Sequence, residues 1–203
     1  MSESSDFYKT LSAPATGIFR DRGSKFHAFL FPVTNESEIK EHLAQIRKEH
    51  YGARHHCYAW RLGVETIRFR ANDDGEPSST AGKPILGQLT SHDLTNVLCV
   101  VVRYFGGTLL GVGGLINAYR MAASDAIANA SVEARPIERK LILLLSYPIL
   151  NAVMQLIKSE NLTPTAIQME ERVEIHLSVL LSAADHIESL FTQIYGVTVQ
   201  RLE

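Results

Sequence analysis

Two short segments of this sequence concentrate the residue types that bind ligands or carry out chemistry. The first is residues 72–84, here the acidic loop, whose candidate binding residues are Asp73, Asp74, Gly75, Glu76, Thr80, Gly82 and Lys83. Carboxylates can grip a cation, whereas hydroxyls, amides and a lysine can grip an anion. An irregular stretch of this length inside a compact domain favours a binding loop. The alternative is a solvated turn whose Asp and Ser side chains cap the local backbone.

The second segment follows an apolar run and holds five glycines within nine residues. Its candidate binding residues are Arg103, Tyr104, Phe105, Gly106, Gly107, Gly111, Gly113 and Gly114. The glycines predict a sharp turn with positive φ angles or a close approach of the backbone to a neighbour. A charge at the end of an apolar strand needs a partner, and we expect Glu76 or Asp74 to pair with Arg103.

Familiar nucleotide motifs do not fit these segments. A phosphate-binding P-loop would need Ser or Thr where Pro84 stands, and the glycines after residue 105 are out of register for a dinucleotide fold. Pro84 instead suits the first turn of a short helix, so the amides near Ala81 and Gly82 could receive an anion. No nucleophile elbow surrounds Ser78 or Ser79.

No metal or cofactor is expected. His55, His56 and Cys57 are adjacent, but neighbouring strand residues point to opposite faces, and a second cluster of zinc ligands is missing from the sequence. Arg54, His55 and Arg61 more simply extend a basic surface, and the candidate RNA contacts are Arg54, His55, Arg61 and Arg120.

Charge and composition describe an ordinary globular protein. Of the 203 residues 45% are apolar, and the net charge is −2, so no global positive field attracts nucleic acid. Residues 1–135 contain 15 basic and 14 acidic residues, and residues 136–203 contain 5 and 8. A polyanion would therefore meet the first part. The polar start, the lack of a long apolar run and two unpatterned cysteines predict a cytoplasmic protein with no membrane contact.

The elements that must position these residues fall into two domains, at 1–135 and 136–203. From about residue 137 the apolar period predicts strand, helix, two strands, helix and strand, with helices opening near Pro148 and Ser182 and the second closing at Gly196. This βαββαβ order is that of a ferredoxin-like domain, with one antiparallel sheet covered by two helices.

The first domain is predicted as a compact α/β fold. Its expected elements are a hairpin in 16–33, a helix at 37–50 capped by Asn35 or Ser37, strands at 55–62, 67–70 and 96–105, a short helix from Pro84 and a helix at about 112–132. Residues 134–139 are the expected linker. The whole chain is thus assigned to the α+β class.

Residues 73–84 (DDGEPSSTAGKP) and 103–115 (RYFGGTLLGVGGL) resemble, in order and spacing, the signature of the IMPACT family, in its bacterial two-domain form. The resemblance implies a first domain similar to the second domain of ribosomal protein S-five and a second domain similar to domain V of elongation factor G. It also implies a role in regulating translation, with RNA or ribosome association following by analogy. Eukaryotic relatives restrain a starvation-response kinase partly through an extra N-terminal RWD domain, for which this chain has no room, so we do not expect that role.

Three positions depart from the family pattern. Ser79 stands where glycine is usual, Leu109 where lysine is common and Asn117 where a basic residue is common. Two cations that could contact phosphates are therefore missing near the glycines.

We expect a non-enzymatic, translation-associated regulator or binding module that contacts the ribosome, RNA or a translation factor, with Lys83 and Arg103 adding to the basic contacts. One alternative is a metal-dependent or acid/base enzyme that uses residues 73–76 on a small or phosphorylated substrate. Another is a protein-interaction module that uses the exposed sheet face of residues 136–203. No DNA partner is expected.

Overall fold

The computed structural model describes residues 6–202, and the chain divides into two compact units. One unit is Tyr8–Arg135, and the other is residues 136–202 together with Asp6 and Phe7. The strands and helices up to residue 136 are β1 (Phe7–Leu11), β2 (Ala15–Asp21), β3 (Ser24–Pro32), α1 (Glu36–Glu49), β4 (His55–Leu62), β5 (Arg68–Asn72), α2 (Gly82–Ser91), β6 (Val97–Tyr104), α3 (Gly111–Ala128) and β7 (Val132–Pro136). The strands and helices from residue 138 onward are β8 (Glu138–Leu145), α4 (Leu150–Ser159), β9 (Pro164–Met169), β10 (Val173–Leu180), α5 (Ala184–Thr192) and β11 (Thr198–Leu202).

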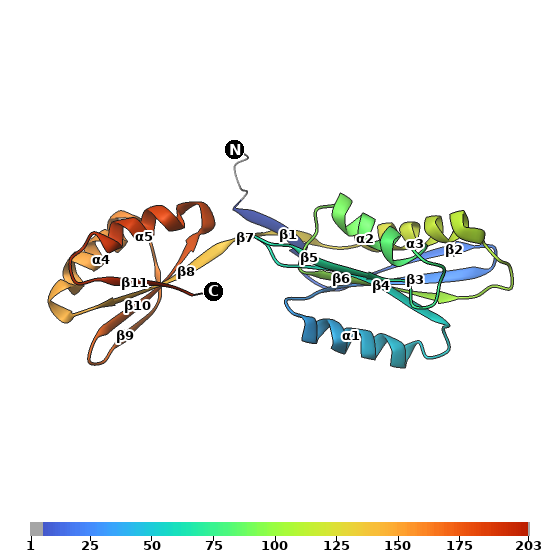
Figure 1. Ribbon diagram of the computed structural model, residues 1–203, viewed down its shortest axis with the longest axis horizontal. Coiled ribbons are helices and arrows are strands. Elements are labelled where there is room, and N and C mark those ends of the chain that lie inside the picture. The colour runs from blue at the N-terminus through green and yellow to red at the C-terminus, as the bar shows by residue number, and fades with distance from the viewer. Residues whose placement is uncertain (1–5, 203) are drawn as a thin grey trace. The chain divides into compact units, whose positions relative to one another are not determined.

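The first unit is built on an antiparallel sheet of order β2-β3-β6-β4-β5, with α1 on one face and α2 and α3 on the other (Figure 1). The central strand β6 is buried from Val97 to Arg103. Its Cys99 and Val101 join the core under α2 and α3, while Val100 and Val102 join the core under α1. A strand covered on both faces has no polar alternation, and this explains the apolar run in the sequence.

Two predictions made from neighbouring residues, the first hairpin and the cap of the first helix, are confirmed. The hairpin of β2 and β3 turns at Arg22 and Gly23, whose φ angles of 44° and 80° suit the twist of a two-residue connection. At the start of α1 the side chain of Asn35 accepts hydrogen bonds from the backbone N–H groups of Ser37 and Glu38, so Asn35 is the cap.

The sequence pattern missed two short strands, β1 and β7, which pair in a two-stranded sheet. The helix predicted to reach about residue 132 ends at Ala128, and β7 and β8 occupy most of the linker expected at 134–139. Both strands are short and of mixed polarity, and their pairing joins segments more than a hundred residues apart. Local periodicity contains no signal for such a contact.

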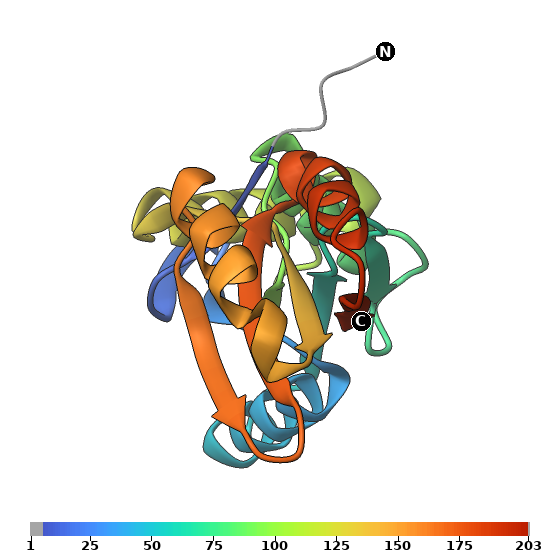
Figure 2. The same cartoon turned by 90° about the vertical axis from the view of Figure 1, so that its left-hand side faces the viewer.

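The second unit contains the expected order of elements. Its sheet has the order β11-β8-β10-β9 with every neighbouring pair antiparallel, and α4 and α5 cover the same face (Figures 1 and 2). The prediction that the Ser182 hydroxyl caps the last helix is wrong. Its Oγ and its backbone N–H both donate to the carboxylate of Asp6, at 2.6 and 2.8 Å.

Two further features concern the cysteines and the apolar character of the helices. Cys57 and Cys99 are free thiols and both are buried. Within residues 6–202, no helix has the length and apolar character needed to cross a membrane.

Candidate binding site

The acidic loop uses the carboxylate of Asp73 for its own structure. Oδ1 accepts hydrogen bonds from the backbone N–H groups of Ala81 (3.0 Å) and Gly82 (2.8 Å), and Oδ2 accepts one from Ser79 (2.9 Å). An acidic group here satisfies donors that have no partner inside α2 and interacts favourably with the helix dipole. The anion expected at these amides is therefore supplied by the protein itself.

Asp74 ties the loop to β4 and α1. Its Oδ2 accepts a hydrogen bond from the backbone N–H of His56 at 2.7 Å, and its Oδ1 accepts one from Arg47 of α1 at 3.1 Å. Its carbonyl oxygen lies 2.8 Å from Nδ1 of His55. Asp74, like Asp73, already has protein donors around it.

Glu76 points inward and forms a buried ion pair. Its side chain is 4% exposed, and Oε1 accepts hydrogen bonds from Nη1 of Arg103 at 2.7 Å and from the hydroxyl of Tyr119 at 2.8 Å. Of the two partners predicted for Arg103, the structure selects Glu76. Because both charges are buried, removing either one would leave the other uncompensated.

Arg103 has one donor that remains unused. Its guanidinium lies 5.5 Å from the ring centre of Phe26 and 5.6 Å from that of Phe105. Its side chain is 7% exposed, and its Nε–H has no hydrogen-bond acceptor anywhere in residues 6–202. Buried donors are nearly always paired, so this one marks a place where an added acceptor would be stabilised.

Two other polar groups beside this ion pair are unsuited to catalysis. The thiol of Cys57 lies 3.0 Å from the carbonyl oxygen of Asp73 and 3.4 Å from the hydroxyl of Tyr119. Burial raises the pKa of the Cys57 thiol and that of the Tyr119 hydroxyl far above their usual ranges. Both groups are therefore neutral near pH 7, and neither is an activated nucleophile or a base.

The second sequence segment forms the glycine turn, residues 105–114, which runs from the end of β6 through the first turn of α3. At Gly106 a Cβ would lie 1.9 Å from the carbonyl carbon of Gly23, so the turn packs directly on the β2–β3 hairpin. Gly107 and Gly111 have φ angles of 88° and 70°. Both reasons expected for glycine, close approach and positive φ, therefore apply here.

The two segments meet at a cavity of about 370 Å³ in the first unit. Its lining residues come from the start of β4, the acidic loop, the end of β6, the glycine turn and α3: Arg54, His55, Glu76, Pro77, Arg103, Phe105, Leu109, Leu110, Gly111, Val112 and Leu115. Gly111, Val112 and Leu115 belong to the start of α3, and Leu110 directly precedes it. No side chain caps the N-terminus of this helix. This cavity is the candidate binding site.

Several predicted site residues lie elsewhere. Tyr104 points to the α1 face, where its hydroxyl lies 2.8 Å from Nδ1 of His50, because it neighbours Arg103 on a strand. Thr80 is buried and donates to the carbonyl of Pro77. Lys83 is exposed in the first turn of α2, and Arg120 is exposed on α3, where it donates to Asn117.

The expectation of a basic surface that includes Arg61 is wrong. Arg61 is 8% exposed, and its Nη1 donates to the carbonyl oxygens of Leu94 at 2.7 Å and Leu89 at 3.4 Å. It thus satisfies carbonyls at and beyond the end of α2 rather than facing solvent. Arg54 and His55, in contrast, do line the cavity.

Sequence reasoning missed Tyr119 and most of the apolar wall. Tyr119 follows Leu115 by four residues and precedes Ala123 by four, so helical spacing places it on the buried face of α3. A buried tyrosine hydroxyl needs a partner, and that requirement was the available signal. For Leu109, Leu110 and Val112 no comparable signal exists, because apolar residues near a turn are common.

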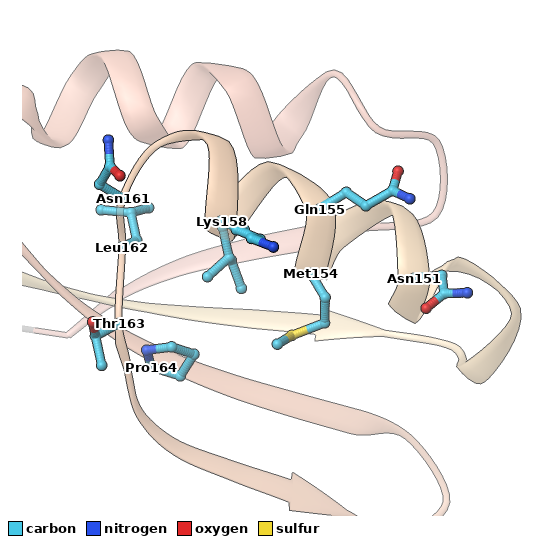
Figure 3. Close-up of a pocket in the computed structure, with 9 residues that line it drawn as sticks. Asn151, Met154, Gln155, Lys158, Asn161, Leu162, Thr163 and Pro164 are labelled. Atoms are coloured by element: carbon cyan, nitrogen blue, oxygen red, sulfur yellow. The ribbon is translucent and has the colours of Figure 1, made fainter.

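A second cavity of about 640 Å³ lies in the other unit, beside α4 (Figure 3). Exposed Asn151, Gln155 and Lys158 on α4, together with the segment from Asn161 to Pro164, form much of its lining. It contains no buried charge, so it is the weaker candidate. Across residues 6–202, no group of three or more His, Cys, Asp or Glu side chains is arranged to hold a metal ion.

Comparison with known proteins identifies the family. Residues 22–127, more than half of the chain, match the family model of the Impact N-terminal domain. The chain belongs to the IMPACT family. The matched segment contains Glu76, Arg103 and Tyr119, so the buried cluster lies within the domain that defines the family.

Bacterial IMPACT family members are among the similar proteins. The chain is 36% identical to the member YvyE of Bacillus subtilis over 156 residues, which are 77% of this chain and 72% of YvyE. It is 37% identical to YigZ of Escherichia coli over 126 residues, 61% of this chain and 62% of YigZ. A crystal structure described as that of a hypothetical protein has a TM-score of 0.72 and 26% identity, with 98% of each chain covered.

Proposed function

We propose that this IMPACT family member is a non-enzymatic binding protein that acts in translation, and that its first unit holds a partner at the cavity between Arg103 and the start of α3. The observation that carries the proposal is the contrast inside the site. The three carboxylates of the acidic loop are bonded to the protein, whereas the cavity beside them has exposed apolar walls, and Arg103 in its lining keeps a buried, unpaired donor.

The first half of that contrast argues against an enzyme built on the acidic loop. Asp73 is bonded to three backbone amides, Asp74 to Arg47 and His56, and Glu76 is buried against Arg103. A metal site or an acid/base pair would need carboxylates that are open to the substrate and adjustable in pKa. The acidic loop therefore acts as a scaffold for the cavity.

The second half supports binding. Phe105, Leu109 and Val112 are 54%, 81% and 60% exposed, although they are large and apolar. Grouped apolar side chains at a cavity mark an interaction site more often than an inert surface. The assignment to translation rests on membership of the IMPACT family, because similarity to this family implies a role in regulating translation.

Sedimentation of the full chain with ribosomal fractions tests the proposal. We expect the chain to pellet with ribosomes at low salt, and the variant Leu109→Asp to remain in the supernatant because the new charge is placed on the apolar wall. Tyr51→Asp is the matched control, since Tyr51 is 89% exposed on the loop after α1, outside the cavity lining. Absence of the unaltered chain from every ribosomal fraction at low salt would rule out the proposed function.

We also propose the finer fold and compartment assignments. The order β11-β8-β10-β9 with two helices on one face supports a ferredoxin-like second domain similar to domain V of elongation factor G. The family supports a first domain similar to the second domain of ribosomal protein S-five. The boundary at residue 136 supports domains 1–135 and 136–203, except that Asp6 and Phe7 pack with the later one. Two buried free thiols agree with a cytoplasmic location.

A further inference from the structure

The lining of the cavity has an apolar part and a charged part. Phe105, Leu109 and Val112 form exposed apolar walls, and Leu110 and Leu115 form a buried apolar part of the lining. A volume of about 370 Å³ lies at the small end of the range for ligand sites, which is about 300 to 1,000 Å³. A space of this size suits one large side chain or one small ring.

The charged part of the lining is positive on balance. It contains Arg54 and Arg103 against the single carboxylate of Glu76, and the uncapped N-terminus of α3 adds partial positive charge. The unpaired Nε–H of Arg103 adds a buried donor that lacks an acceptor. These groups together favour an occupant with a negatively charged oxygen next to its apolar part.

A protein segment fits this lining better than an RNA base. Sequence-tolerant binding of single-stranded RNA relies on several aromatic rings for stacking and on a row of cations for the phosphates. Here the aromatic rings among the lining residues are the Phe105 ring and the His55 imidazole, and the other exposed walls, Leu109 and Val112, are aliphatic. Aliphatic walls favour an apolar side chain.

We infer that the cavity binds a segment of a partner protein, which inserts one large apolar side chain and places an adjacent carboxylate, from an acidic residue or a chain end, by Arg54 and Arg103. This assignment rests on the proposed function, since it names the class of partner that the same cavity receives. The apolar wall supplies the affinity, and the cations select the carboxylate.

Titration of the isotope-labelled full chain with small probes tests this inference by nuclear magnetic resonance. N-acetyl-phenylalanine supplies a ring and a carboxylate, N-acetyl-phenylalaninamide supplies the ring without the charge, and adenosine monophosphate represents a nucleotide. We expect N-acetyl-phenylalanine to shift the backbone amides of Leu110 to Leu115 and the Nε–H of Arg103. Its affinity should exceed that of the amide about tenfold, as a charge-assisted hydrogen bond predicts.

Two variants locate the charge selection. Arg54→Gln should clearly weaken the preference for the carboxylate probe, because only Arg103 and the helix start then remain to select it, and should leave binding of the amide unchanged. Arg120→Gln is the matched control, because Arg120 is exposed on α3 but does not line the cavity, and it should keep the preference.

Two results would overturn the inference. One is the absence of shifts at the cavity with either phenylalanine probe at about 10 mM, a concentration at which even millimolar binding is visible. The other is tighter binding of adenosine monophosphate than of N-acetyl-phenylalanine at the same residues, which would assign the cavity to nucleic acid. If the chain sediments with ribosomes but binds neither phenylalanine probe, the proposed function stands and the ligand class inferred here is wrong. If the chain binds the carboxylate probe but does not sediment with ribosomes, the ligand class stands and the proposed function is wrong.

Discussion

The acidic loop and the glycine turn lie on either side of one cavity, yet they differ in what they leave available. The acidic loop is rich in carboxylates and hydroxyls, and its three acidic side chains are bonded to the protein. The glycine turn is poor in functional groups, and it exposes Phe105 and Leu109 beside an uncapped helix start. A loop that is dense in polar residues can therefore use them to stabilise its own conformation, so polar density alone does not indicate a ligand site.

The strongest test of this comparison targets the pair that joins the two segments. Glu76→Gln should lower the free energy of unfolding by about 3 kcal/mol, because it leaves the charge of Arg103 buried without a partner. Arg103→Met should have a similar cost, and the double variant should cost clearly less than the sum. Urea unfolding of the four proteins measures this. Simple additivity would mean that the two side chains act independently.

Next in size is the scaffold role of Asp73. Asp73→Asn should cost about 2 kcal/mol, since the charge at the start of α2 and one acceptor for the backbone amides are lost. Asp74→Asn should cost about 1 kcal/mol, because its partner Arg47 is half exposed and the ion pair is screened by solvent. Thermal unfolding of both variants gives the order, and an inverted order would assign the scaffold role to Asp74.

Protonation on the α1 face should weaken the fold below neutral pH. Burial lowers the pKa of His56, and burial, followed by the charge of His50, lowers that of His27. The unfolded chain then binds protons more readily just below pH 6.5, so stability is complete above that pH and falls as the pH drops toward the folded-state pKa values. Urea unfolding between pH 7.5 and 5.5 measures the loss. His56→Gln should reduce the slope, and an unchanged slope would exclude His56 as a cause.

A smaller gain is expected from relaxing the loop. Ser79 has a φ of 63°, a left-handed conformation that glycine adopts without strain. Ser79→Gly should therefore stabilise the first unit by about 0.5 kcal/mol, the strain relieved minus the added chain entropy. Ser78→Gly relieves no positive φ and should be neutral or destabilising. Equal effects at both positions would show that φ is not the cause.

The glycine turn should give the smallest effect on stability. Leu109→Ser changes an exposed side chain that the fold does not need, so its free energy of unfolding should stay within about 0.5 kcal/mol of the original. The same variant should weaken sedimentation with ribosomes. A large loss of stability would instead place Leu109 in the core and remove the contrast between the two segments.

Much of the fold could be predicted because its signals are local. The β2–β3 hairpin, the Asn35 cap and the buried strand β6 each follow from a few neighbouring residues. The order of elements after residue 137 follows from apolar periodicity in the same way. β1 and β7 were not predicted because each strand is stabilised by a partner far away in the sequence.

Within the candidate site, pairing was predictable and geometry was not. A charge that ends an apolar strand needs an opposite charge, and that argument reached Glu76 as the partner of Arg103. No local rule separates Arg54, which lines the cavity, from Arg61, which is turned inward to the carbonyls of Leu89 and Leu94. Only the packing of α2 on β4 decides between them.

The pairing of β1 with β7 and of Asp6 with Ser182 affects the order in which the chain can be completed during synthesis. The backbone N–H of Ser12 donates to the carbonyl of Ser131, and Asp6 receives both donors of Ser182. Asp6 and β1 therefore complete these contacts only after residues more than a hundred positions later in the chain have been synthesised. The nascent chain can form the β2–β3 hairpin early, but β1 cannot pair with β7 until residues 132–136 have emerged.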